Sequence, residues 1–327
     1  MVAPLVSVVT PFYNTAQWLG ACIESVLAQD FADFEYLLVN NCSTDGSAEI
    51  AREYAKRDDR IRVIDQPEFL SQSGNFNSAL RAINGESRYC KMILADDLLF
   101  PSCLREMVQV AERHPSIGIV SSYLLNGDRV GAAGLPYPDE CFPGREIARD
   151  QLTKGRYFLG SPSVVMYRAD IVRRNPEFFQ DHRYSADSIR AYQCLLESDL
   201  GFVHQVLSFL RDREDSIGAE VGDYRHYLLD AYIQLQLHGK QVLSGLEYQR
   251  VRRRLRREYF GFLGIEALYN HRPGLWAFTN GGLALIGESF TGWRRLRWML
   301  AGLLHIVTHP GRVIRVANRK LSRRNRS

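Results

Sequence analysis

Residues 5–14 read LVSVVTPFYN, and this stretch decides the fold. It opens with a run rich in β-branched residues that stops at Pro11, which predicts a strand over residues 5–10. Residues 16–28 follow with apolar side chains at helical spacing, among them Leu19, Ile23 and Val26. The chain therefore begins with a strand and a helix.

The alternation of strand and helix continues over the first 125 residues. Further strands are predicted at residues 34–40, 61–64, 89–94 and 117–122, and helices at residues 47–56, 74–83 and 101–113. Strands that alternate with helices form βαβ units, so the fold class is α/β, with a Rossmann-like, mostly parallel sheet flanked by helices. Ligands bind at the carboxyl ends of the strands in such sheets.

The second part of the chain is organised differently. Glycine and proline are frequent in residues 127–160, which we interpret as a loop-rich excursion of the kind that forms binding loops. A helix over residues 185–197 and a strand over residues 201–210 are predicted next, and helices from residue 224 onward. The predicted parts are a first domain at residues 1–222, divided near residue 125, a helical extension at 223–289 and a tail at 290–327.

Composition excludes several classes of protein. The 327 residues are 46% hydrophobic and 24% charged, which argues against collagen-like, disordered and multi-span membrane proteins. The six cysteines form no C-x-x-C pair, so we expect reduced thiols in a cytosolic protein. The first ten residues lack a basic segment, so no signal peptide is expected. The apolar stretch at residues 296–308 is too short and too interrupted for a transmembrane helix.

Positive charge is concentrated at the C-terminal end. The formal net charge is only +4, but ten of the 41 lysines and arginines lie in residues 290–327, which hold no acidic residue. The remaining 31 basic residues face 37 acidic ones, so the tail alone is strongly basic. Tryptophans and leucines interleave with these cations, which favours an anionic membrane surface over nucleic acid as the partner. The alternative is a C-terminal helix packed on the first domain.

Polar and aromatic residues follow three of the predicted strands. They are Pro11, Tyr13 and Asn14 after the first strand, Asn40 and Asn41 after the second, and Asp96 and Asp97 after the fourth. Strand ends that face one crevice would bring an aromatic ring, amide groups and carboxylates together. Such a site suits a ligand with a flat base and a negative charge.

Four segments in this order resemble the successive motifs of family 2 glycosyltransferases. They are residues 6–14, VSVVTPFYN; residues 24–29, ESVLAQ; residues 43–46, STDG; and residues 95–101, ADDLLFP. The resemblance covers roughly residues 4–216. It implies a GT-A fold, an inverting sugar transfer and a nucleoside diphosphate sugar as donor, with UDP or dTDP favoured. It also implies that residues 1–222 form a catalytic domain, with a donor-binding half at about 1–125 and an acceptor-binding half at about 126–222.

The residues themselves support a nucleotide site. Tyr13 can stack on a base, although an ordinary core or surface tyrosine is the alternative. Asn40 and Asn41 can bond a base edge or a ribose, and turn chemistry is the competing reading. The family usually has an aspartate pair where these asparagines stand, which leaves the choice of base open. Asp45 is expected to organise its turn.

Asp96 and Asp97 form the sharpest signal. Two adjacent carboxylates repel each other unless a cation lies between them, and Mn²⁺ or Mg²⁺ commonly bridges carboxylates and substrate phosphates. The alternative is that they cap the helix that follows. The first aspartate of the family's Asp-x-Asp pattern is replaced by Leu94, so Asp96 is the expected metal ligand and Asp97 an auxiliary one.

The resemblance also implies a base and partners for the diphosphate. Asp187, at the start of a predicted helix, matches the position of the catalytic aspartate, with a first-turn helix residue as the alternative. The cations that we consider for the diphosphate are Lys91, His182, Arg211 and Arg213, although most such charges are solvated surface groups. Asn77 matches a donor-binding asparagine.

We therefore expect a metal-dependent inverting glycosyltransferase that serves cell-surface polysaccharide synthesis. The acceptor is expected to be a hydroxyl of a glycan, lipid-linked, and the protein to lie at the inner face of the cell membrane. Two alternatives remain at this point. One is a binding scaffold whose site has decayed, and the other is a nucleotidyltransferase, which normally has a glycine-rich loop after its first strand.

Overall fold

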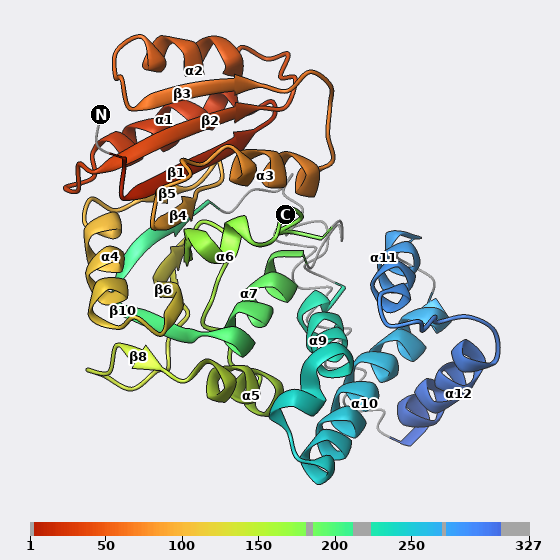
Figure 1. The fold of residues 1–327 in the computed structure, drawn as a ribbon. Coiled ribbons are helices and arrows are strands. Elements are labelled where there is room, and N and C mark those ends of the chain that lie inside the picture. The colour runs from red at the N-terminus through yellow and green to blue at the C-terminus, as the bar shows by residue number, and fades with distance from the viewer. Residues whose placement is uncertain (1–2, 181–185, 212–223, 270–272, 309–327) are drawn as a thin grey trace. The chain divides into compact units, whose positions relative to one another are not determined.

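The computed structural model describes residues 3–180, 186–211, 224–269 and 273–308. The chain forms two compact units, an N-terminal unit of residues 1–219 and a C-terminal unit of residues 220–327. Figure 1 shows both units as a ribbon. Each is described by itself below.

The N-terminal unit contains a ten-stranded sheet with α-helices packed against it (Figure 1). The strand order is β3-β2-β1-β4-β9-β6-β10-β5, while β7 pairs with β6 and β8 pairs with β10. The strands are β1 (Val6–Phe12), β2 (Phe34–Asn40), β3 (Ile61–Asp65), β4 (Tyr89–Met92), β5 (Leu98–Leu99), β6 (Ile117–Asn126), β7 (Arg129–Gly131), β8 (Cys141–Phe142), β9 (Met166–Arg168) and β10 (Asp199–Leu210). The helices are α1 (Ala16–Leu27), α2 (Ser47–Ala55), α3 (Gln72–Arg81), α4 (Cys103–Arg113), α5 (Gly144–Lys154), α6 (Ala169–Arg173) and α7 (Ala186–Glu197).

The predicted alternation of strands and helices is confirmed. β1 to β4 are mutually parallel, and β6 and β10 are parallel to each other, while β9 runs antiparallel between β4 and β6. Apolar side chains of α1 and α4 pack on Val6, Val8 and Leu38 to form the main core. On the opposite face of β1, the hydroxyl of Ser7 lies 2.7 Å from that of Ser87.

The segment at residues 127–160 is less irregular than predicted. It contains β7, β8 and the helix α5. The sequence of α5 is polar, so its apolar periodicity is weak, and the helix depends on its packing against α7. Gly144 permits this packing, because a Cβ atom there would lie 2.0 Å from the carbonyl oxygen of Ser198.

The C-terminal unit is helical, as predicted from residue 224 onward. Its helices are α9 (His226–Val242), α10 (Gly245–Tyr269), α11 (Pro273–Ala284) and α12 (Gly292–Thr308). The rings of Trp298 on α12 and Phe260 on α10 stack with centroids 5.8 Å apart. Arg294 pairs with Glu288 and lies 4.5 Å from the Phe260 ring, so the start of α12 is fixed on its neighbours. No described helix combines the length and the apolar character needed to cross a membrane.

Candidate active site

The topology of the sheet places a switch point beside β1, where a crevice is expected outside the strand ends. The chain builds β1, β2 and β3 in one direction and then returns to place β4 on the other side of β1. At such a switch point the connections leave in opposite directions, and ligands bind outside the carboxyl ends of the strands. Pairing of Phe12 with Asn40 and of Val9 with Met92 brings the predicted residues after β1, β2 and β4 to this edge.

An exposed aromatic pair lies at this edge. The ring of Tyr13, which is 45% exposed, meets the ring of Phe69 edge to face, with centroids 4.8 Å apart. Phe69 lies between β3 and α3 and is 61% exposed. It was not predicted, and the only signal was an aromatic residue in a polar loop. Each ring leaves part of its apolar surface exposed beside the strand ends.

The loops after β1 and β2 are fastened together by short polar side chains. The Asn14 side-chain oxygen accepts a hydrogen bond from the Thr44 backbone amide at 2.9 Å. The Asn14 backbone amide donates to the Ser43 hydroxyl at 3.1 Å. Asp45 accepts hydrogen bonds from the amides of Ala16 and Ser47, in agreement with the expected turn role. These bonds hold the loops after β1 and β2 together before any ligand binds.

Asn40 and Asn41 already have partners within the chain. Asn40 donates to Asp65 at 2.8 Å and accepts from the Ser43 amide at 2.9 Å. Asn41 donates to the Leu70 carbonyl at 3.0 Å and accepts from the Leu70 amide at 2.9 Å. Both asparagines are buried. Asn41 therefore holds the loop that carries Phe69 close to Tyr13.

Asp96 and Asp97 have different environments although they are adjacent. Asp96 is partly exposed, whereas Asp97 is only 5% exposed. The Asp97 carboxylate accepts hydrogen bonds from the Ser163 hydroxyl at 2.5 Å and from the Arg211 amide at 3.1 Å. Burial raises the pKa of Asp97 to about 7, even though the bond from Ser163 acts in the opposite direction.

Lys91 lies beneath this pair and is completely buried. Its ammonium donates to the carbonyl oxygens of Ser163 and Met92, and burial lowers the pKa of its amine. Ser163 in turn accepts a hydrogen bond from the Leu94 amide at 2.9 Å. The sequence suggested Lys91 as a partner of the diphosphate. The structure places it where it supports the Asp96–Asp97 loop from inside.

The carboxylates suit a metal ion that arrives with the substrate. Among the described residues there is no group of three or more His, Cys, Asp or Glu side chains able to hold an ion. Both oxygens of Asp97 are engaged, which leaves Asp96 as the carboxylate that lies nearer to solvent. Mg²⁺ and similar ions are often bound by one or two carboxylates together with substrate phosphates. The residues therefore fit a divalent cation that is shared with a diphosphate.

Arg211 completes this side of the crevice. Its Nε donates to the Asp96 carbonyl oxygen at 3.0 Å, and its guanidinium lies 4.4 Å from the ring centroid of Trp18. Trp18 was predicted only as an apolar residue of α1, because helical spacing does not reveal that a ring also supports an arginine. Two residues considered for the site, His182 and Arg213, lie outside the described residues.

Asp187 lies in the first turn of α7, and its side chain is partly exposed. Asn77, on α3, bonds the backbone of Phe179 in both directions: its amide nitrogen donates to the carbonyl at 2.7 Å, and its oxygen accepts from the amide at 2.8 Å. Asn77 is buried, so it fastens the segment before α7 to α3.

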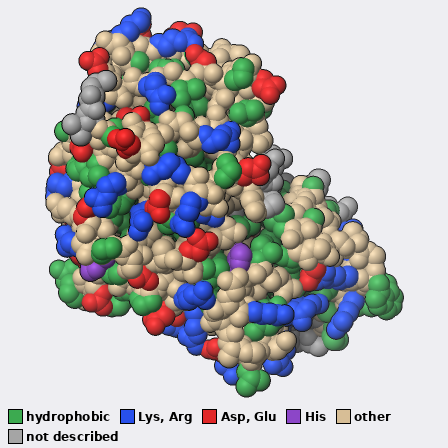
Figure 2. All heavy atoms as spheres, viewed as in Figure 1, with side chains coloured by type: hydrophobic (Ala, Val, Ile, Leu, Met, Phe, Trp, Pro, Cys, Tyr) green, Lys and Arg blue, Asp and Glu red, His purple; other side chains and the backbone are tan. Residues whose placement is uncertain are grey.

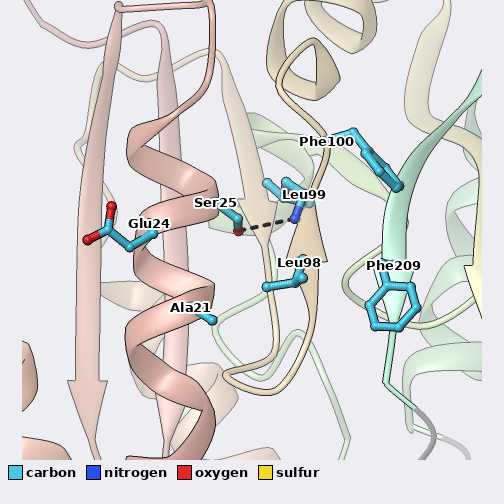
Figure 3. Close-up of a pocket in the computed structure, with 7 residues that line it drawn as sticks. All are labelled: Ala21, Glu24, Ser25, Leu98, Leu99, Phe100 and Phe209. Carbon is cyan, nitrogen blue, oxygen red and sulfur yellow. Dashed lines mark hydrogen bonds between the residues drawn. The ribbon is translucent and has the colours of Figure 1, made fainter.

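A separate cavity of about 700 Å³ lies between α1, β5 and the end of β10. Figure 3 shows its lining, which comes from Ala21, Glu24, Ser25, Leu98, Leu99, Phe100 and Phe209. The Ser25 hydroxyl accepts a hydrogen bond from the Leu99 amide at 3.2 Å, the dashed line in Figure 3. No predicted site residue lines this cavity.

The family model described as Glycosyl transferase family 2 matches residues 7–175, about half of the chain. The chain belongs to this family. The predicted family is thus confirmed, and the match spans β1 to α6, which include the strand ends described above.

Similar family 2 proteins come from bacteria. The chain is 30% identical over 194 residues to the glycosyltransferase EpsJ of Bacillus subtilis, covering 57% of this chain and 54% of that protein. It is 24% identical over 220 residues to the glycosyltransferase GlyG of Streptococcus pneumoniae, covering 65% and 72%. The chain therefore spans about half the length of EpsJ.

Solved structures of glycosyltransferases confirm the predicted GT-A fold. TarS of S. aureus, in a crystal structure with UDP-GlcNAc, superposes with a TM-score of 0.62 at 16% identity, covering 86% of this chain and 81% of that chain. The mannosyltransferase PcManGT of Pyrobaculum calidifontis, in complex with GDP-Man and Mn²⁺, gives 0.53 at 17% identity, covering 95% and 82%.

The buried carboxyl of Asp97 predicts a pH-dependent stability. Its pKa in the folded chain exceeds the value of about 3.9 for an unfolded aspartate. Its contribution to stability is therefore full below pH 4 and is lost as pH rises through 7. Asp97→Asn removes this loss. One pKa unit corresponds to about 1.4 kcal/mol, so the variant should gain up to about 4 kcal/mol relative to wild type between pH 4 and pH 8.

Urea unfolding of both proteins across this range measures the difference. The asparagine amide can still accept a hydrogen bond from Arg211 and donate one to Ser163, so the variant is expected to fold. A difference that stays constant with pH would contradict the assignment of the raised pKa to Asp97.

Proposed function

We propose that this family 2 protein is an inverting glycosyltransferase. It would transfer a sugar from a nucleoside diphosphate donor to a glycan hydroxyl in the synthesis of a cell-surface polysaccharide. The observation that carries this proposal is the exposed Tyr13–Phe69 ring pair after β1, which lies at the same edge of the sheet as Asp96 after β4. This pattern suits a ligand with a flat base at one end and a diphosphate at the other.

The base of the donor would lie against the rings of Tyr13 and Phe69, since aromatic faces stack on any base. Asn41 is the neighbouring group with both a donor and an acceptor, and it now bonds Leu70. UDP and dTDP remain the favoured nucleotides. The crystal structure of TarS with UDP-GlcNAc supports a nucleotide-sugar donor for this fold.

The diphosphate would lie over Asp96 and Arg211. Asp96 would hold a divalent cation, Mn²⁺ or Mg²⁺, which neutralises negative charge on the leaving diphosphate when it is bound. The structure of PcManGT with GDP-Man and Mn²⁺ supports such an ion. Arg211, fixed by its bond to the Asp96 carbonyl, adds a second positive charge on the leaving group.

Asp187 would act as the base. In an inverting transfer, the acceptor hydroxyl attacks the anomeric carbon from the face opposite the leaving diphosphate and gives its proton to a carboxylate. Asp187 lies on α7, away in sequence from the residues proposed for the diphosphate. Its partly exposed carboxylate leaves access for an acceptor.

Replacement of Asp187 separates chemistry from binding. Asp187→Asn keeps the shape of the side chain but removes the proton acceptor, so transfer should fall at least about 1,000-fold. Donor binding should stay within about twofold of wild type, because no donor contact is assigned to this residue. Product formation from a panel of UDP-, dTDP- and GDP-sugars, with calorimetry of the donor that binds, measures both quantities.

Turnover by Asp187→Asn at the wild-type rate would remove this residue from the mechanism. Donor binding by wild type without any turnover on the panel and a pooled glycan acceptor would favour the alternative of a binding scaffold. Asp128→Asn, at an exposed turn between β6 and β7, is the matched control and should retain wild-type rates.

We also propose that α12 places the enzyme on an anionic membrane, with a lipid-linked glycan as the acceptor. Leucines and a tryptophan form an exposed stripe along α12 at helical spacing: Trp293, Leu296, Leu300, Leu303 and Leu304. Trp298 points the other way and packs on Phe260. Figure 2 shows lysine and arginine side chains gathered over the C-terminal unit on the face in view. An apolar stripe beside cations is typical of interfacial helices.

Two of the tail's arginines have structural partners. Arg294 pairs with Glu288, and Arg295 lies 4.6 Å from the ring centroid of Trp276. Arg297 is exposed. Membrane attraction would therefore depend on the apolar stripe together with only part of the positive charge counted in the sequence.

Flotation with vesicles of phosphatidylglycerol and phosphatidylethanolamine tests this proposal. Trp293→Glu combined with Leu300→Glu should weaken binding more than about tenfold, since each buried apolar side chain contributes about 1.5–3 kcal/mol. Leu246→Glu is the matched control, because Leu246 is 82% exposed on α10 and lies off the stripe. Equal flotation of wild type and the double variant would overturn the membrane proposal.

A further inference from the structure

Arg190 is a buried cation in the second turn of α7. It lies three residues after Asp187, so the two side chains are neighbours along the helix. Only 6% of Arg190 is exposed. Buried arginines normally have anionic partners, because an ion removed from water needs compensating bonds.

The contacts of Arg190 leave one edge of its guanidinium open. The guanidinium lies 4.5 Å from the ring centroid of Phe178, and Nη1 donates to the Gln193 side chain at 3.2 Å. Nε and Nη2 are buried, and neither has a hydrogen-bond partner among the residues that the structure describes. These two nitrogens form a single edge, spaced to donate to both oxygens of one carboxylate or phosphate.

Other arginines of this chain show what fills that edge. Nε and Nη2 of Arg60 both donate to the Asp58 carboxylate, at 3.0 and 2.7 Å, while the guanidinium lies 4.4 Å from the Phe34 ring. Three further arginines direct the same edge to a carboxylate: Arg105 to Asp30, Arg113 to Glu140 and Arg168 to Asp170. Arg190 has the ring beneath it and lacks the carboxylate.

The described residues around Arg190 hold it in place, and none of them provides a hydrogen-bond partner for Nε or Nη2. Phe178 meets Tyr167 and Phe179 edge to face at 5.0 Å, and Asn77 fixes the backbone of Phe179. Cys194 lies one turn further along α7, and burial raises the pKa of its thiol to about 12. Its interaction with Arg190 lowers that pKa by less than burial raises it, so the thiol stays neutral and is not an anionic partner. The arginine is thus positioned before any partner arrives.

We propose that the Nε–Nη2 edge of Arg190 binds an oxyanion, a carboxylate or a phosphate, carried by the acceptor glycan. This inference rests on the proposed function, because the acceptor is the substrate that must reach Asp187. The two residues are one helical turn apart, so the anion would lie near the attacked hydroxyl. Since the edge is buried in the free protein, entry of the acceptor must uncover it. Arg190 would then select acidic acceptors over neutral ones.

Thermal unfolding of the full chain, saturated with UDP and Mn²⁺, tests the proposal. Three probes are compared: methyl glucuronide for a carboxylate, glucose 6-phosphate for a phosphate and methyl glucoside as the neutral counterpart. One anionic probe should raise the melting temperature of wild type more than methyl glucoside does. Arg190→Met should weaken binding of that probe about 10- to 100-fold. Arg190→Lys should weaken it less, since lysine keeps the positive charge but cannot form the bidentate pair of hydrogen bonds.

The matched control is Arg60→Met, which removes an arginine whose edge is filled within the chain. It should lower the melting temperature without ligand and leave the probe response intact. Arg190→Met should leave that temperature equal or higher, because it removes an uncompensated buried charge. A fall like that of Arg60→Met would mean that the chain supplies the partner and would overturn the proposal.

Equal responses of wild type to the anionic and neutral probes would also overturn it. The effect of UDP alone distinguishes this failure from a failure of the proposed function. If UDP raises the melting temperature while the anionic probes raise it no further, only the proposed role of Arg190 is contradicted. If UDP itself has no effect on the melting temperature, the proposed donor site is contradicted, and so is the role of Arg190 that rests on it.

Discussion

The buried carboxylate of Asp97 connects parts of the chain that lie far apart in sequence. It accepts hydrogen bonds from Ser163, which precedes β9, and from the backbone of Arg211, which follows β10. The Lys91 ammonium binds the same Ser163 residue through its carbonyl oxygen. A low-dielectric interior strengthens such bonds and makes an unpaired group costly, so the network has one favourable arrangement. That arrangement fixes the position of the neighbouring Asp96.

Asp96 and Asp97 are adjacent in sequence but differ in burial and in their contacts. Asp97 is buried and bonded to Ser163 and Arg211, whereas Asp96 is partly exposed and its backbone carbonyl accepts a hydrogen bond from Arg211. The loss of an aspartate at Leu94 therefore need not abolish metal binding, because an ion shared with a diphosphate can use a single well-placed carboxylate. A second pair of distant segments is joined in a similar way, because the side chain of Asn77 on α3 bonds the backbone of Phe179, which precedes α7.

Local patterns were sufficient to predict β1 to β4, β6 and β10 and the helices α1 to α4 and α7. β2 has the bounds that were predicted for it, because β-branched and aromatic residues in a short apolar run leave little choice of structure. The helix α5 was missed because tertiary packing, and not its own periodicity, stabilises it. Motif spacing also indicated the strand-end residues. Which of them bond within the chain was not predictable, since Asn41, Asn77 and Lys91 have partners that are distant in sequence. The open edge of Arg190 likewise depends on what surrounds it.

Calorimetric titration of the full chain with UDP, in Mn²⁺ and in EDTA, tests most directly whether a diphosphate and a metal ion meet at Asp96. Wild type should bind UDP at least about tenfold more tightly with Mn²⁺, because a charge-assisted contact contributes roughly 1.5–3 kcal/mol. Asp96→Asn should lose that increment, and Asp128→Asn, at an exposed turn, should keep it. An increment that survives in Asp96→Asn, or is absent in wild type, would contradict the account.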